Sequence, residues 1–398
     1  MEKAEKIFGY LLKDFASNPD YKENWEDLGD GRKALKRYPC KLPPQLQISH
    51  PFIVYIAFVT LKTFPFLGRF EKIAWEIPIL YKNKPFLLAH RKFGFDISIN
   101  KEDEEMYALG IEAISMIHKA IPFVETLANP LIRNTVNEGK ITIESSYTKI
   151  RNRYVYYREK IAEEHNSDKE KLKTKAQNFG PGKFANIDET MEAYREIQRL
   201  QSVNYYHLLS MIDAYFSLLE HVSVLLLPFI KGIKIKEIKI EEFMGGTWKS
   251  KLKIVLKTNT NKEALKFIEI LDEIKEQIRN PASHGHFQKK GQSFYVHMKG
   301  IGAIPFTLTQ SKTNFKYGFS SKTAISYSDI CKHFDNFDSY LNTSETKFGM
   351  QYIQNDLPVA YDPKSVAEYR RRMRTDKSAS NYIEETTREM ENAINMDW

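Results

Sequence analysis

Residues 213–221 read DAYFSLLEH, and they lie in a stretch that the sequence predicts to be one long helix, residues 188–227. Asp188 is a suitable N-terminal cap, and Pro228 marks the end because proline has no backbone donor. The last part, residues 205–229, is nearly all apolar. We therefore expect this helix to be buried on most sides there and to organise the fold around it.

The polar residues of this helix form a narrow stripe. Asp213, Ser217, Glu220 and His221 follow one another at spacings of four, three and one. Buried polar groups cost free energy unless they are paired. The stripe therefore faces either a hydrogen-bonded partner helix or a functional site, and the sequence leaves both readings open.

A second amphipathic helix leads to the residues RNPASHG at 279–285. Its apolar positions recur three and four residues apart and form one face: Ala264, Phe267, Ile268, Leu271, Ile274 and Ile278. Arg279 lies where this face ends. Because Pro281 removes a backbone donor and disfavours helical geometry at Asn280, we expect a break or kink at this point.

This motif combines a permanent cation with a titratable group. Arg279 can hold a phosphate through a planar fork of donors, and His284 can exchange a proton near neutral pH. A metal-independent ribonuclease needs these two groups. The spacing alone is not specific, because Arg158 and His165 also show it, in a charged segment typical of a solvated helix face.

The geometry of an unbroken helix would separate the two groups. Residues five apart point about 140° away from each other, so Arg279 and His284 would not face one phosphate. Either the break realigns them, or two copies of the motif meet across the axis of a symmetric dimer.

Three segments together resemble the HEPN superfamily. They are the long helix with DAYFSLLEH, the segment TWKSKLK at residues 247–253, and the Arg-Asn-x-x-x-His-Gly motif. The resemblance covers about residues 188–345, under half of the chain. It implies an all-helical bundle that is usually dimeric. Many members are metal-independent ribonucleases of toxin–antitoxin, abortive-infection and CRISPR systems.

The resemblance also implies site residues. Arg279 and His284 match the catalytic pair, and Asn280 matches the polar residue that often follows the arginine. In many members an acidic or polar residue on the preceding long helix supports the pair. Asp213 and Glu220 are both candidates for that role.

The implied reaction is endonucleolytic cleavage of RNA by attack of a ribose 2′-hydroxyl on the adjacent phosphorus. The expected protein is a toxin or an effector of anti-phage defence that cleaves RNA when triggered. The alternative is a catalytically inactive HEPN-like dimer that binds RNA or a nucleotide, or acts as a scaffold. A different enzyme or a nucleotide-binding protein that uses the same pocket is a third interpretation.

The whole chain is expected to be mainly α-helical, with an α+β domain before the helical bundle. The predicted parts are an N-terminal domain (1–165), a polar linker (166–187), a HEPN-like helical domain (188–345) with a β insertion at about 290–327, and a helical tail (346–398). The β insertion rests on extended-looking segments at 293–298 and 324–327, before a final helix at 328–341.

Several local patterns define the flanking parts. Residues 79–88 are typical of two short strands around a polar turn, and helices are expected at 102–128 and 142–164. The linker contains Gly-Pro-Gly at 180–182, without the spacing of a phosphate-binding loop. In the tail, Asp362-Pro363 is a helix start.

The net charge of +8 is consistent with a partner that carries phosphates. Basic clusters lie at 169–175, 231–239, 249–257 and 370–374. A lysine-rich proteome would give the same composition. We expect RNA as substrate, a homodimer with a composite active site, and an antitoxin or trigger protein as a further partner.

Cofactors, metals and membranes are not expected. Cys40 and Cys331 lie far apart, which argues against a structural zinc site and a disulfide-built secreted fold. His284-Gly285-His286 with His221 or His207 is the remaining metal alternative. The apolar stretch at 51–67 contains a lysine and two prolines, so it does not read as a membrane span, and no secretory signal precedes it. The expected location is the cytoplasm.

Overall fold

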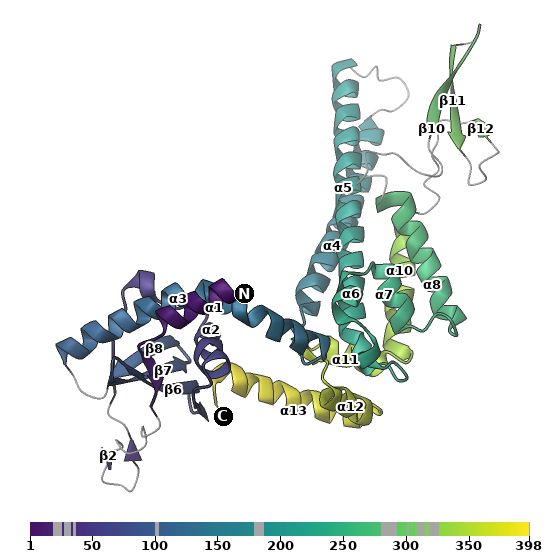
Figure 1. Cartoon of the computed structure of the whole chain (residues 1–398). Helices are drawn as coiled ribbons and strands as arrows, with labels where there is room; N and C mark the ends of the chain where they lie inside the picture. Colours follow the sequence, from purple (N-terminus) through teal and green to yellow (C-terminus); the bar gives the residue numbers. More distant parts are fainter. Residues whose placement is uncertain are drawn as a thin grey trace. The chain divides into compact units, whose positions relative to one another are not determined.

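The computed structural model shows a mostly helical chain with a small antiparallel sheet in the N-terminal region (Figure 1). It describes residues 1–18, 26–27, 33–34, 37–99, 103–178, 187–279, 293–300, 302–308, 315–317 and 326–397. The chain forms two compact units, Met1–Glu138 with Glu384–Trp398, and Gly139–Ile383. The expected α+β N-terminal part and helical C-terminal part are therefore confirmed.

The first unit is built on an antiparallel sheet. Its strands, in spatial order, are β1 (Phe15–Ser17), β6 (Ile73–Tyr81), β7 (Lys84–Arg91), β8 (Gly94–Ile99) and β4 (Tyr38–Pro39), and β5 (Leu67–Phe70) pairs with β6. The predicted strand pair at 79–88 is confirmed as the β6–β7 hairpin. Its turn, Lys82-Asn83, has positive φ angles of 47° and 61°, as a tight hairpin turn requires.

Helices pack on one face of this sheet. They are α1 (Glu2–Leu11), α2 (Phe52–Tyr55), the π-helix η3 (Ile56–Leu61) and α3 (Glu104–Asn137). The core joins strand residues such as Ile77 and Leu88 to Ile114 of α3. A Cβ atom on Gly110 would lie 2.8 Å from the Cys40 sulfur, so a glycine is needed where α3 approaches the sheet. On the opposite face, buried Glu76 pairs with Arg37 and Arg91.

The second unit is a bundle around one long helix, α5 (Ile187–Leu226). Helix α4 (Tyr147–Asn178) packs along α5, as do α7 (Trp248–Val255) and the π-turn η6 (Lys275–Arg279). Helix α8 (Lys262–Ile274) contacts α7 and α10 (Tyr327–Thr343). The predicted long helix at 188–227 is confirmed to within one residue at each end. The segment Ser202–Phe229 is long and apolar enough to cross a membrane, and 72% of its most apolar window is buried inside the structure.

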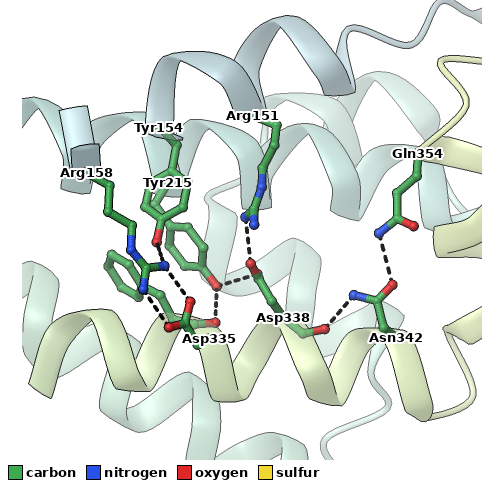
Figure 2. Close-up of polar contacts among 9 residues, drawn as sticks. Arg151, Tyr154, Arg158, Tyr215, Asp335, Asp338, Asn342 and Gln354 are labelled. Atoms are coloured by element: carbon green, nitrogen blue, oxygen red, sulfur yellow. Dashed lines mark hydrogen bonds and ion pairs between the residues drawn. The ribbon is translucent and has the colours of Figure 1, made fainter. Parts of the chain in front are cut away.

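A network of polar side chains connects α4, α5 and α10 (Figure 2). The Arg151 guanidinium lies 2.6 Å from the Asp338 carboxylate, and the Tyr215 hydroxyl donates to that carboxylate at 2.9 Å. Arg158 makes a two-point contact with Asp335. Tyr215 is fully buried and stacks on Phe334 with the ring centroids 3.8 Å apart. Burial raises the pKa of Asp338, and the nearby Arg151 opposes this shift.

The remaining helices and strands are mostly short. In the first unit they are β2 (Glu26–Asp27), β3 (Lys33–Ala34) and η2 (Pro44–Leu46); in the second, β9 (Thr142–Ile143), η4 (Leu227–Phe229), η5 (Ile235–Glu237), α6 (Ile240–Gly245), β10 (Ser293–Met298), β11 (Gly302–Leu308), β12 (Phe315–Tyr317), α11 (Lys347–Ile353), β13 (Val359–Ala360) and α12 (Pro363–Arg372). Helix α13 (Asp376–Asn395) includes the division between the units at residue 383. Asp362 caps α12 through the backbone N–H groups of Lys364 and Ser365, as predicted.

Some boundaries differ from the sequence prediction. Helix α4 continues to Asn178, so most of the predicted linker at 166–187 is helical. The charged residues there are good helix formers, and their polarity alone does not indicate a loop. The first unit consists of Met1–Glu138 together with Glu384–Trp398, whereas the sequence prediction placed an N-terminal domain at 1–165. Tyr327 begins α10 instead of ending a strand, because Ser326 and Asp329 form a reciprocal capping box.

Candidate functional site

The polar stripe of α5 divides between two sides of the helix. Asp213 and Glu220 face α7 and η6, and their side chains are 51% and 48% exposed. The Ser217 hydroxyl beside them donates to the Asp213 carbonyl of its own helix. His221 instead contacts the start of α4, where its Nε2 accepts from the Ser146 backbone N–H at 2.9 Å. The stripe therefore serves two different environments.

Arg279 reaches the stripe from a change in helix geometry. Helix α8 begins at a side-chain cap from Asn261 and buries the predicted face, with Phe267 half-buried against Phe337 and Tyr340. The regular helix ends at Ile274, and η6 follows as a π-turn. Such turns are rare and occur frequently at functional sites. The turn brings the Arg279 Nε to 2.9 Å from Asp213 Oδ1, with the arginine side chain 34% exposed.

Glu220 has a different partner. The Lys251 ammonium on α7 lies 2.8 Å from its carboxylate, and the Lys251 side chain is only 3% exposed. Helix α7 begins at Thr247, whose hydroxyl accepts from the Ser250 N–H. A buried ammonium needs an anion beside it. The structure thus distinguishes the two acidic candidates: Asp213 contacts the motif arginine, whereas Glu220 neutralises a buried lysine.

Two further lysines lie near Asp213, Glu220 and Arg279. Lys249 pairs with Asp272 of α8 at 2.5 Å. The Lys275 ammonium lies over two buried aromatic rings, 5.0 Å from the centroid of Phe216 and 5.3 Å from that of Trp248. We call this group the α5–α7–η6 cluster. Its charged members are Asp213, Glu220, Lys249, Lys251, Asp272, Lys275 and Arg279.

The other residues of the motif lie outside the part of the chain that the structure describes. They are residues 280–285, including Asn280, Pro281, His284 and Gly285, and His286 after the motif also lies outside that part. The metal alternative of His284-Gly285-His286 with His221 or His207 also includes residues outside that part. Within the described ranges, no group of three or more histidine, cysteine or acidic side chains could hold a metal ion.

His221 is held as a neutral acceptor. Its Nε2 accepts a hydrogen bond, so that nitrogen carries no proton in this arrangement. Burial lowers the His221 pKa, and the Asp356 carboxylate opposes this effect. Asp356 also accepts from the Thr148 N–H at 3.0 Å, so both residues cap the N-terminus of α4. His221 therefore has a structural role at the start of α4.

Two of the four predicted basic clusters make local contacts within the described residues. In 231–239, Lys234 pairs with Glu237 and Lys239 with Glu242. In 370–374, Arg370 donates to the carbonyls of Pro228 and Ile233, and Arg371 pairs with Glu368. In 249–257, Lys249 and Lys251 pair with carboxylates of the α5–α7–η6 cluster.

Sequence reasoning did not assign roles to Lys251, Asp272 or Lys275. Lys275 precedes Arg279 by four residues, and residues four apart on a helix lie on the same face. That spacing could have indicated from the sequence that the two cations are neighbours. The contacts of the other two depend on how α7 and α8 meet. Comparisons with protein-family models, with curated proteins and with solved structures found no match to this chain.

Proposed function

We propose that this chain is a metal-independent endoribonuclease of the HEPN type, acting as a toxin or an abortive-infection effector. The observation that carries the proposal is the contact between Arg279, at the start of the Arg-Asn-x-x-x-His motif, and Asp213 on the long helix. It supplies the acidic support that the resemblance implies for the motif arginine. The pair is half-exposed, so a substrate phosphate can approach it.

The proposed reaction is an internal transesterification. His284 removes the proton from a ribose 2′-hydroxyl, and the 2′-oxygen forms a bond to the adjacent phosphorus. The bond from phosphorus to the 5′-oxygen breaks, and that oxygen takes a proton from His284 of the partner subunit or from water. The products are a 2′,3′-cyclic phosphate and a 5′-hydroxyl. General acid–base help of this kind gives about 10²–10⁴-fold in rate.

Arg279 stabilises the negative charge that develops on the phosphoryl oxygens. The hydrogen bond to Asp213 uses Nε, and a guanidinium has further N–H donors on its two terminal nitrogens. Asp213 fixes the direction of the guanidinium before substrate binds, and preorganisation of this kind lowers the cost of stabilising the transition state. Asp213 is a positioning residue in this scheme, and Asn280 next to Arg279 is a further candidate for contact with substrate.

The proposed assembly is a homodimer with a composite site. In this proposal two copies of the motif meet across a two-fold axis, which brings identical patches together. RNA is the proposed substrate, and an antitoxin or trigger protein is the proposed regulator. The proposed location is the cytoplasm.

A binding module is the second candidate. Asp213 occupies part of the Arg279 guanidinium and competes with a phosphate for it. If that competition dominates, the same cluster would hold RNA or a nucleotide without cleaving it. The two candidates differ in one measurable property, the release of cyclic phosphate ends.

The test is cleavage of total RNA in the presence of EDTA, with mapping of the RNA ends. We expect wild type to give 2′,3′-cyclic phosphate ends. Arg279→Ala should lower the rate by about 10²–10³-fold, as loss of one charge-stabilising donor does elsewhere. Asp213→Ala should lower it by a smaller factor than Arg279→Ala, because it removes only the group that orients the guanidinium, and His284→Ala should abolish it. A requirement for a divalent metal, or full activity of Arg279→Ala and His284→Ala, contradicts the proposal. RNA binding without cleavage supports the binding module.

A further inference from the structure

Lys275 has a fixed position beside Arg279. It is the first residue of η6, and its ammonium lies over the rings of Phe216 and Trp248. Those rings are themselves buried and meet edge to face, 4.8 Å between centroids. A cation over an aromatic face is attracted by the ring quadrupole. The two rings therefore hold the ammonium in one place, four residues before the motif arginine.

Among the residues that the structure describes, the charges around Lys275 do not balance. The groups whose charges act on it are Arg279, Glu220, Asp213 and Asp272. Each of the three carboxylates already has a cation of its own: the pairs are Asp213–Arg279, Glu220–Lys251 and Asp272–Lys249. The α5–α7–η6 cluster thus has four cations and three carboxylates. Lys275 is the surplus cation within this set.

The surplus has an energetic consequence. Burial lowers the Lys275 pKa, the positive charge of Arg279 lowers it further, and the three carboxylates oppose the shift. The ammonium form is therefore less favoured here than in a free lysine. An anion bound between Lys275 and Arg279 would relieve both the repulsion and the charge surplus. Lys275 is half-buried, so one side of it remains accessible.

We propose that Lys275 binds a phosphodiester of single-stranded RNA beside the phosphate held at Arg279. This inference rests on the proposed function and makes it more specific: the substrate is contacted at two phosphates, one by each cation. Lysine acts as a point charge toward phosphate, whereas arginine gives a directed fork. Lys275 accordingly contributes binding to the RNA backbone, without base preference.

The test uses a probe that the proposed reaction cannot cleave. It is a short fluorescein-labelled RNA in which every ribose carries a 2′-O-methyl group, so no 2′-hydroxyl is present. Its Kd is measured by fluorescence anisotropy over a series of salt concentrations. The variants are Lys275→Met, which keeps the apolar stem against the two rings, and Lys275→Arg, which keeps the charge. Lys266→Met, an exposed lysine of α8, is the matched control.

We expect Lys275→Met to weaken binding about tenfold at low salt and to reduce the slope of log Kd against log salt by about 0.7, the loss of one phosphate contact. Lys275→Arg and Lys266→Met should keep the wild-type slope. An unchanged slope in Lys275→Met, or no binding by wild type, overturns the inference. Should Lys275→Met fail to fold, Lys275→Gln is read in the same way.

The two proposals fail separately. A chain that shows the Lys275-dependent slope but does not cleave unmodified RNA contradicts the ribonuclease and leaves the second phosphate contact supported. A chain that cleaves RNA while Lys275→Met binds the probe like wild type contradicts only the role of Lys275.

Discussion

The two sides of helix α5 use similar polar groups in different ways. Toward α4 and α10, Tyr215 and Asp338 are paired within a network in which two arginines meet two carboxylates (Figure 2). Toward η6 and α7, Asp213 and Glu220 are half-exposed, and four cations meet three carboxylates. An arginine–aspartate contact by itself therefore does not indicate a site. The excess of one charge distinguishes the two sides, and Asp338 (22% exposed) is more buried than Asp213 (51%), although Asp335 of the same network is 50% exposed.

The largest expected effect separates these sides by stability. Asp338→Ala removes the carboxylate partner of Arg151 and one of two acceptors near the buried Tyr215 hydroxyl, the other being the Phe334 carbonyl. We expect a loss of about 3 kcal/mol in the free energy of unfolding, because the largely buried Arg151 guanidinium loses its carboxylate. Asp213→Ala, the matched change on the exposed side, should cost less than about 1 kcal/mol. Urea unfolding followed by circular dichroism measures both.

A milder substitution at Asp338 tests whether the loss of an oxygen acceptor causes part of the destabilisation. Asp338→Asn keeps an oxygen acceptor for Tyr215, so its loss should be clearly smaller than that of Asp338→Ala. Equal losses for Asp338→Ala and Asp213→Ala would contradict the expectation that the more buried carboxylate contributes more to the free energy of unfolding.

The sequence predicted the helices on both sides of this comparison but not the contacts between them. The limits of α5 follow from the apolar run before Pro228, and the buried face of α8 follows from its three-and-four spacing. Both signals are local. The choice between Asp213 and Glu220 depends on which neighbouring helix each one meets, and on the π-turn that redirects Arg279. No spacing within one helix contains that information.

In the predicted linker, by contrast, a local signal was present in the sequence but was misinterpreted. Residues 166–178 were assigned to it for their polarity, yet their lysines and glutamates have high helix propensity, and α4 continues through them. Lys275 was missed because its role depends on rings that come from α5 and α7. Residues 280–292, which include most of the motif, lie outside the described ranges, so His284 stays a prediction from the sequence.

The Glu220–Lys251 pair allows a comparison within the side of α5 that faces α7 and η6. Glu220→Ala leaves the buried Lys251 ammonium without its carboxylate. Because Glu220 itself is half-exposed and water can approach from that side, we expect a loss of about 1–2 kcal/mol in the free energy of unfolding. Glu220→Gln keeps an acceptor and should cost less. A loss below that of Asp213→Ala in the same urea unfolding assay would contradict the assignment of Glu220 to Lys251.

The smallest expected effect concerns the dependence of stability on pH at His221. Burial lowers the folded-state pKa of His221, and an unfolded histidine has a pKa of about 6.5. The unfolded state therefore binds a proton more readily than the folded state. The stabilisation from neutral His221 is present above the unfolded pKa and is lost as the pH falls below it. Protonation would also remove the acceptor of the Ser146 N–H.

We expect this term to be under about 1 kcal/mol between about pH 7.5 and pH 5. The matched variant is His221→Gln, which keeps an acceptor near Ser146 but does not titrate. The free energy of unfolding, measured by urea at both pH values, should fall more in wild type than in His221→Gln. Parallel losses would assign the acid sensitivity to other groups. The contact between His221 and the start of α4 would then not depend on the charge of the imidazole.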